Sequence, residues 1–410
     1  MIMTDNNENK VLNVPHLRFP EFSGEWEKYR LCDVASIVGR IGFRGYTTND
    51  IVTKGKGAIA LSPTNIENNK LTYDKDNTYI SFYKYEESPE IMIKQGDVIF
   101  VKTGSTVGKV AYVDKLICKT TLNPQVVVLK DIQCDNYLLS VLMSTNKFQN
   151  AIRKIIVGGA VPTLSQAAMG DIVVTMPQAT EQEKLSKFIS LLDDRIATQN
   201  KIIEDLKILK SAIIEKHYRC VKKHSVRVEE LGKPFSVGNL SKDDLSEIGV
   251  PCIIYGELFT TYGAIINKVE SHTKKIDGMT LSRKGDLLFP SSTTVDAVSL
   301  IAPSAINVDG VILGGDMFGI HVNSNFDAQY LSYFFNHIAK NQFAKYAKGS
   351  TIIHLHHTDI DKAKLLLPCL EEQNRMAMCM VSLDEKITIE SAILKTMLIQ
   401  KSYLLRQMFI

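Results

Sequence analysis

The sequence lacks the features of secreted, disulfide-stabilised or membrane proteins. Its 410 residues include only seven cysteines, an odd and scattered set without any Cys-x-x-Cys spacing, which excludes a disulfide framework and a zinc ribbon. No run of eighteen apolar residues occurs, so no membrane span is expected. The Asn-rich start has no apolar core like that of a signal peptide, and we expect residues 1–14 to form a flexible arm. These absences predict a cytoplasmic protein with free thiols.

An excess of one charge is also missing. The formal net charge is only +3, from 48 Lys and Arg against 45 Asp and Glu. This balance permits a polyanionic partner without requiring one, because local clustering of Lys and Arg matters more for DNA binding than the total. The hydrophobic share of 45% is that of a globular protein, and the length allows two or three domains.

What the sequence does contain is an internal repeat. Pro177 and Pro368 each precede an acidic, Gln-containing segment, at an offset of 191 positions (368 − 177). The same offset relates further pairs without a gap, namely Leu164 and Leu355, Asp193 and Asp384, Ile196 and Ile387, and Lys210-Ser211 and Lys401-Ser402. Upstream, residues 96–100 resemble residues 285–289. A period this long excludes a solenoid and predicts duplication of a domain plus a helix, with pseudo-twofold symmetry.

The constant part of each copy has the pattern of a long helix. Residues 181–217 contain no Pro or Gly, and Thr180 with Glu183 forms a capping box. Apolar residues recur every three or four positions in both copies: Leu185, Phe188, Leu192, Ile196, Ile203, Leu206, Leu209 and Ile213, then Met376, Cys379, Leu383, Ile387, Leu394, Met397 and Leu404. Such a helix spans about 55 Å at about 1.5 Å per residue. The pattern predicts an antiparallel, coiled-coil-like pair that acts as a spacer between two domains. The alternative is two independent helices, each packed on its own domain.

The variable part of each copy indicates an α+β fold. Short β-branched runs predict strands at residues 91–93, 97–102, 107–113 and 126–130, and at 287–289, 298–301 and 317–322 in the second copy. A helix is predicted after each set, over residues 135–155 and 327–346. Strands followed by helices fit an α+β domain better than a doubly wound sheet.

Three local patterns fall short of catalytic or metal-binding motifs. Residues 104–109 resemble a phosphate loop but have one residue too few between the glycines, which favours a turn between strands. Residues 123–125 lack the second proline and the aromatic residue of an amino-methyltransferase motif. His354, His356 and His357 have no matching ligand spacing. We therefore predict no catalytic residue, no metal site and no cofactor in this chain.

Polar and basic residues in corresponding loops are the candidate DNA-binding groups. Arg, Lys, Ser and Thr donate hydrogen bonds to phosphates, and Arg or Lys reads guanine edges. In the first copy the candidates are Arg40, Arg44, Lys54, Lys56, Lys102, Thr103, Ser105 and Lys109. In the second they are Lys274, Lys275, Ser291, Ser292, Thr293, Thr294, Lys345 and Lys348. Each residue alone is more typical of an ordinary surface, and the argument rests on their duplication.

The duplicated series as a whole resembles the specificity subunit of type I restriction-modification enzymes. Its marks are residues 20–26 before Leu31-Cys32-Asp33-Val34, Gly96-Asp97-Val98-Ile99, Gly158-Gly159 with Leu164, and Pro177 with Glu181-Gln182. All but the first recur in the second half, where Gly349 stands alone for the glycine pair. The resemblance covers nearly the whole chain.

This resemblance implies a division of labour among several chains. Two target recognition domains, over residues 15–177 and 220–367, would each read half of a split site in double-stranded DNA. The helices, over 178–219 and 368–410, would set the gap and dock two modification subunits, with restriction subunits completing the complex. S-adenosylmethionine, ATP and Mg²⁺ are expected in the partner subunits. The competing hypotheses are a stand-alone methyltransferase or nuclease with degenerate motifs, and a scaffold that binds only protein.

Overall fold

The computed structural model describes residues 13–73, 76–159 and 161–409. It divides into two compact units, one formed by Met1–Thr198 with Lys395–Ile410 and the other by Gln199–Leu394. The arm expected at residues 1–14 lies almost entirely outside the described residues. Within the described chain, no helix combines the length and apolar character needed to cross a membrane.

The first unit is built on two mixed sheets. One has the order β2-β11-β8-β9-β6-β5 and the other β10-β4-β7-β3, while β1 pairs with β12. The strands are β1 Glu27–Arg30, β2 Ser36–Gly39, β3 Ile51–Val52, β4 Ala58–Leu61, β5 Ile66–Glu67, β6 Asn69–Leu71, β7 Tyr79–Ile80, β8 Val98–Val101, β9 Val110–Tyr112, β10 Thr120–Leu122, β11 Val126–Lys130 and β12 Val173–Met176. The helices are α1 Leu31–Val34, α2 Phe82–Glu86, α3 Asn136–Ser144, α4 Asn146–Ile155 and α5 Gln166–Gly170, with 3-10 turns at Gly42–Arg44, Thr48–Asp50, Pro63–Asn65 and Pro89–Ile91.

The second unit repeats this plan. Its sheets have the orders β14-β24-β20-β22-β17 and β15-β18-β16-β23-β19, with the pairs β13-β26 and β21-β25. The strands are β13 His224–Arg227, β14 Gly232–Ser236, β15 Leu245–Ser246, β16 Val250–Ile254, β17 Ile265–Ile266, β18 Ser271–Thr273, β19 Thr280–Leu281, β20 Asp286–Pro290, β21 Ser292–Thr293, β22 Ser304–Ile306, β23 Ile312–Gly314, β24 Met317–Val322, β25 Ile353–His354 and β26 Lys364–Leu367. The helices are α7 Glu257–Thr260, α8 Ala297–Leu300, α9 Ala328–His337, α10 Lys340–Phe343 and α11 His357–Ile360, with 3-10 turns at Val228–Glu230, Lys242–Asp244 and Ala344–Tyr346.

Five of the six strands in the larger sheet of the first unit correspond in order to the five strands of one sheet in the second unit. The order β2-β11-β8-β9-β6 matches β14-β24-β20-β22-β17, and the last pairing is parallel in both. The turn before the central strand is also the same. Asp97 Oδ2 accepts the Lys94 amide at 2.8 Å, and Asp286 Oδ2 accepts the Arg283 amide at 2.8 Å. The glycine repeat noticed in the sequence therefore marks one structural element, a tight turn that leads into a buried strand.

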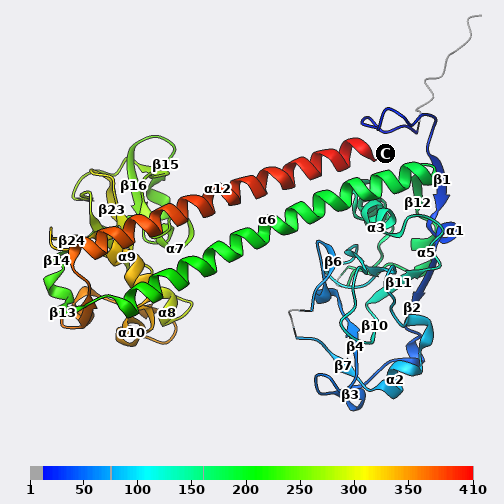
Figure 1. The fold of residues 1–410 in the computed structure, drawn as a ribbon, viewed down its shortest axis with the longest axis horizontal. Coiled ribbons are helices and arrows are strands. Elements are labelled where there is room, and N and C mark those ends of the chain that lie inside the picture. Colours follow the sequence, from blue (N-terminus) through cyan, green and yellow to red (C-terminus); the bar gives the residue numbers. More distant parts are fainter. Residues whose placement is uncertain (1–12, 74–75, 160, 410) are drawn as a thin grey trace, which may run out of the picture. The chain divides into compact units, whose positions relative to one another are not determined.

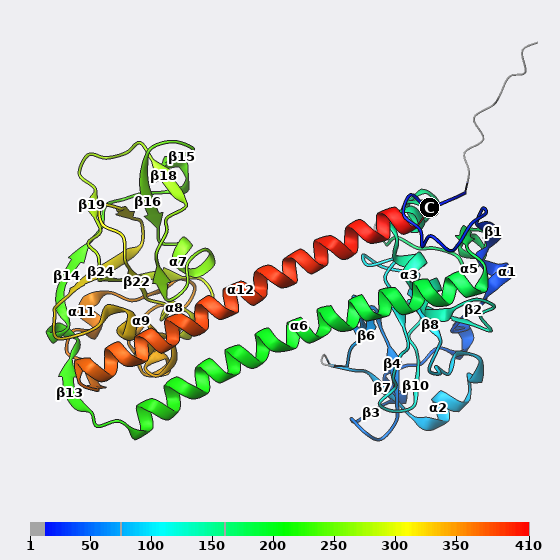
Figure 2. The same ribbon diagram turned by 45° about the horizontal axis from the view of Figure 1, so that its top comes forward.

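Two long helices follow the domains, α6 over Ala179–Cys220 and α12 over Leu370–Met408 (Figure 1). They run antiparallel in the second unit, where Gln199 Nε2 donates to Glu390 O at 3.0 Å and His217 pairs with Glu372 at 3.1 Å. Both views show α3 beside α6 and α9 beside α12 (Figures 1 and 2). The predicted antiparallel pair is confirmed, and the alternative of independent helices is wrong.

A glutamine fixes the start of each long helix on its domain. Gln182 Oε1 accepts the Asp135 amide at 2.9 Å, and Gln182 Nε2 donates to Pro177 O at 2.8 Å. Gln373 makes the same two bonds, with the Asp327 amide at 3.0 Å and with Pro368 O at 2.9 Å. The repeated Pro and Gln residues therefore bond to each other in both copies. Each glutamine satisfies the proline carbonyl and an aspartate amide at the point where the chain enters the long helix.

Four secondary-structure predictions, two strands and two helices, differ from the structure. Residues 91–93 form no strand, because Pro89 starts a 3-10 turn that ends at Ile91. Residues 298–301 were predicted as a strand but lie mostly in α8, where the Asp296 side chain accepts the Ser299 amide at 2.8 Å and caps the helix. The helices predicted over 135–155 and 327–346 are each divided into shorter helices.

Candidate nucleic-acid interface

One candidate loop of each half, the loop after the central strand, occupies the same place in both domains. In the first, Leu164 N donates to Lys102 O at 2.8 Å, and Thr103 bridges to Thr163. In the second, Leu355 N donates to Ser291 O at 2.9 Å, and β21 pairs with β25. Each domain thus has a corner where the loop after its central strand meets the chain that precedes its next short helix. We call these segments, residues 102–105 with 163–164 and 291–294 with 353–355, the duplicated corners.

Several candidate side chains of the first half are open to solvent. Ser105 and Lys109 are exposed, and Lys102 is half-buried. Lys109 Nζ donates to Ile66 O at 3.3 Å, so its side chain is partly held in place. Lys54 and Lys56 are exposed on the loop between β3 and β4. These side chains can offer donors to a polyanion.

Two arginines of the first half serve other roles. Arg40 is buried and donates from Nε to Leu122 O at 2.9 Å and from Nη2 to Thr121 Oγ1 at 3.1 Å. Its expected place on an exposed loop is wrong, because the guanidinium joins β2 to the end of β10. Arg44 Nη1 lies 3.6 Å from Glu90 Oε1, so a carboxylate already partners it.

In the second half, Lys274, Lys345 and Thr294 are exposed, and Thr293 is half-buried. Ser291 and Ser292 are buried, and Ser292 Oγ donates to Asp316 Oδ2 at 2.8 Å. Their expected exposure is wrong, because β21 pairs with β25 and covers them.

Two lysines of the second half are already paired with carboxylates. Lys275 Nζ donates to Asn239 O at 2.8 Å and lies 3.3 Å from Asp244. The Lys348 ammonium donates to Asp359 and lowers the pKa of that carboxyl, although Lys348 itself remains exposed.

Apolar residues beside the duplicated corners were missed. Val157 and Val161 are exposed near the first corner and Ile352 near the second. Gly158 and Gly349 both have positive φ, and a Cβ there would meet the backbone oxygen of Val161 or Ile352. The sequence signal was the repeated glycine, which requires a left-handed residue at this point of both halves.

Segments considered for phosphate or metal binding have ordinary structural roles. Residues 104–109 connect the antiparallel strands β8 and β9, whereas a phosphate loop leads from a strand into a helix. His354 lies in β25. Among the described residues, no group of three His, Cys, Asp or Glu side chains is placed to hold a metal ion.

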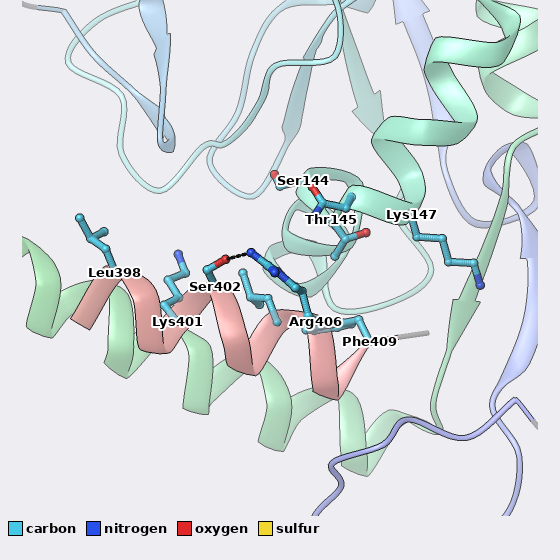
Figure 3. Close-up of a pocket in the computed structure, with 10 residues that line it drawn as sticks. Ser144, Thr145, Lys147, Leu398, Lys401, Ser402, Arg406 and Phe409 are labelled. Atoms are coloured by element: carbon cyan, nitrogen blue, oxygen red, sulfur yellow. Dashed lines mark hydrogen bonds between the residues drawn. The ribbon is translucent and has the colours of Figure 1, made fainter. Parts of the chain in front are cut away.

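A cavity of about 340 Å³ lies between the α3–α4 junction and the end of α12 in the first unit (Figure 3). Lys147, Lys401 and Arg406 line it, but Lys147 extends away from Arg406 (Figure 3). Arg406 donates to Ser402 Oγ at 3.2 Å, and Lys401 pairs with Asp193. The three cations do not converge on one point, so this cavity is not built like an anion site.

The apolar stripes of the long helices face inward. The predicted positions of α6 and α12 are buried or half-buried except Leu209 and Cys379, which are exposed: Leu185, Phe188, Leu192, Ile196, Ile203, Leu206 and Ile213, and Met376, Leu383, Ile387, Leu394, Met397 and Leu404. Leu185 belongs to the core of the first unit, and Met376 to that of the second. Ile189, Ile214 and Met380 are buried as well but were not predicted.

Duplicated α+β domains with matching polar corners, each fixed on a long helix, define a class of two-domain DNA-recognition proteins. The chain belongs to the family described as type I restriction modification DNA specificity domain, whose model matches residues 23–208 and again 221–397. This membership is consistent with a non-catalytic role.

Individual relatives agree with this assignment. The chain is 22% identical to the type I restriction enzyme MjaVIII specificity subunit of Methanocaldococcus jannaschii, over 95% of this chain and 92% of that one. It is 24% identical to the putative MjaX specificity subunit of the same organism, over 93% and 92%. Its fold matches the crystal structure of a type I S subunit from M. genitalium with a TM-score of 0.60 at 13% identity, covering 97% of this chain and 99% of the other. A second match, at TM-score 0.53 and 14% identity, comes from a study of type I R-M complex assembly and covers 93% and 96%.

Proposed function

We propose that each domain reads one half of a bipartite site in double-stranded DNA and that the long helices set the gap between the halves. The duplicated corners carry this proposal, because the same loop occurs once in each domain with different side chains. Exposed Ser105 in one corner is replaced by exposed Thr294 in the other, and half-buried Lys102 is replaced by Ser291, which is buried and unavailable as a donor. Different donors at equivalent positions are what two unrelated half-sites require.

We also propose that the helices dock two copies of a modification subunit. Ile202 and its repeat equivalent Ile393 are both 39% exposed, and Ile208 and Ile399 are 67% and 62% exposed. Apolar side chains that stay exposed at both equivalent positions favour two similar partner surfaces. Methyl transfer and cleavage would belong to partner chains that carry S-adenosylmethionine, ATP and Mg²⁺, with restriction subunits completing the complex.

The test of DNA reading is a library of random duplexes methylated by this chain together with modification subunits. We expect two short blocks of fixed bases separated by a gap of fixed length and free sequence. Omission of either partner should abolish methyl incorporation. A single contiguous block, or methylation by this chain alone, would contradict the proposal.

The test of docking uses Ile208→Glu and Ile399→Glu, with the exposed Tyr83→Phe as control. Each single substitution should remove one modification subunit from the complex, and the double substitution should remove both, as measured by native mass spectrometry. Retention of both partners by the double variant would show that docking occurs elsewhere.

A further inference from the structure

One aspartate in each half holds three elements together. In the first unit, Tyr137 Oη of α3 donates to Asp193 Oδ2 at 2.6 Å, and Lys401 Nζ of α12 donates to Oδ1 of the same carboxylate on α6. In the second unit, Tyr333 Oη of α9 donates to Asp384 Oδ2 at 2.7 Å, and Lys210 Nζ of α6 donates to its Oδ1. We call these sets, Tyr137-Asp193-Lys401 and Tyr333-Asp384-Lys210, the first and second clamps.

Each clamp joins a recognition domain to both long helices. The aspartate comes from the helix that directly follows the domain, the lysine from the other helix, and the tyrosine from the domain itself. Gln182 and Gln373 attach the same domain helices eleven residues earlier on α6 and α12 (193 − 182 and 384 − 373). Two attachments separated by about 16 Å of helix, at about 1.5 Å per residue, prevent a domain from rocking about a single point.

The tyrosines reach the aspartates from different positions. Tyr137 lies in the first turn of α3 and Tyr333 in the second turn of α9, although Asp135 and Asp327 cap the two helices alike. The aspartates and lysines are repeat equivalents, whereas the tyrosines are not. Each domain therefore supplies a hydroxyl to the same aspartate position from a different point of its helix, so the tyrosine contact is not a simple remnant of the duplication.

The clamps are shielded to different degrees. The Asp193 side chain is 12% exposed and that of Asp384 is 37% exposed. Lys210 Nζ also lies 4.8 Å from the centre of the Tyr333 ring. Hydrogen bonds to charged groups strengthen as water is excluded, so the tyrosine–aspartate bond of the first clamp should be stronger than that of the second.

We propose that the two clamps are positioning groups that determine how strictly the gap between the half-sites is measured. This inference rests on the proposed bipartite reading. A domain free to rock on its helices would meet its half-site at neighbouring spacings, whereas a clamped domain meets it at one. The tyrosine hydroxyls and aspartates act through domain orientation and contact no base.

The experiment compares Tyr137→Phe, Asp193→Asn, Tyr333→Phe and Asp384→Asn with wild type in the complex with modification subunits. Each complex methylates duplexes that carry the wild-type half-sites at graded gap lengths. Tyr83→Phe, an exposed tyrosine of the same domain as Tyr137, is the control.

We expect an about tenfold loss of preference for the wild-type gap over its neighbours in the clamp variants, since one hydrogen bond to a charged group contributes roughly that factor. The loss should be larger for Tyr137→Phe than for Tyr333→Phe. The bases read in each half-site, and the gap preference of the control, should be unchanged.

Three results would overturn the inference. One is an unchanged gap preference in folded clamp variants. The second is a uniform loss at every gap length, which would make the clamps merely structural. The third is a wild-type complex without any gap preference, in which case the bipartite proposal fails first and the clamp proposal with it.

Discussion

The buried ion pair between Arg18 and Glu181 offers a quantitative test of how the first unit is held together. Arg18 donates from Nε and Nη2 to the two carboxylate oxygens at 2.7 and 2.6 Å, and the Glu181 side chain is only 1% exposed. Arg18 also donates to Gly24 O at 2.6 Å. One guanidinium therefore attaches the segment before β1 to the start of α6.

Arg18→Met should destabilise the first unit by about 3–5 kcal/mol, because it leaves a buried carboxylate without its partner. For a unit of this size that corresponds to a fall in Tm of roughly 6–20 °C, at about 2–4 °C per kcal/mol. The repeat equivalent of Glu181 is Glu372, which pairs with His217 and is 24% exposed. His217→Leu should therefore cost only about 1 kcal/mol in the second unit. Differential scanning calorimetry of the full chain measures both.

A double substitution distinguishes the cost of leaving the Glu181 carboxylate without a partner from the cost of losing the Arg18–Glu181 contact itself. Replacement of both ionic partners by apolar residues is often close to neutral, so Arg18→Met with Glu181→Leu should recover most of the lost stability. If the double variant is no more stable than Arg18→Met alone, the cost does not arise from an uncompensated carboxylate. A larger shift for His217→Leu than for Arg18→Met would equally refute the reasoning.

Three further predictions concern spacing, DNA contact and pH. Insertion of four residues after Gln199 in α6 and after Ile389 in α12 lengthens both helices between the clamps by about 6 Å, which is close to two base-pair steps of about 3.4 Å. The length of the gap in methylated sites should therefore change, while the bases of both half-sites stay the same. Unchanged spacing with altered bases would exclude the helices as the ruler. Lys102→Ala and Lys109→Ala should weaken binding to the first half-site, whereas Lys345→Ala and Lys348→Ala should weaken binding to the second. Each phosphate contact that a substitution removes should lower the slope of log affinity against log salt by about 1. Equal loss at both half-sites in competition binding would argue against independent domains. Lys348 lowers the pKa of Asp359 in the folded protein. Their pairing therefore stabilises the fold at pH values above the pKa that Asp359 has in the unfolded chain, and this stabilisation is lost as the pH falls through the lower pKa of Asp359 in the folded protein. Lys348→Ala should raise the pKa of Asp359 in an NMR titration, and no change would exclude the pair in solution.

The fold was predictable largely because the duplication repeats contacts as well as residues. The matches Asp193 with Asp384 and Lys210 with Lys401 were visible in the sequence, but their partners were not. Each lysine pairs with the aspartate of the other copy, since the helices are antiparallel. A repeat offset in the sequence shows which residues of the two copies are equivalent. Which residues contact each other depends on how the two long helices pack, and the offset does not reveal that.

The candidate site was less predictable because exposure depends on partners remote in sequence. Arg40 is buried by groups of β10, more than eighty residues away. Ser291 and Ser292 are covered by β25, which the local sequence does not indicate. Conversely, Val161 and Ile352 are exposed three residues after Gly158 and Gly349, two glycines with positive φ that the sequence repeat had marked. Residue type identified the side chains that could donate hydrogen bonds to DNA. Only the strand pairing in the structure distinguished the donors that are exposed from those that already bond to other protein groups.

The contact between Gln199 and Glu390 shows that duplication within one chain allows different residues at two equivalent positions that touch each other. These positions are repeat equivalents, and equivalent residues of a twofold pair touch each other only near the symmetry axis. Both are buried, so two glutamates at this point would place like charges together at considerable cost. A symmetric dimer of the second half would have that problem. In the single chain the first copy carries glutamine, whose amide donates to Glu390. The duplicated protein can therefore carry unlike groups where repeat-equivalent positions of its two long helices meet, just as its two domains carry different side chains in the duplicated corners.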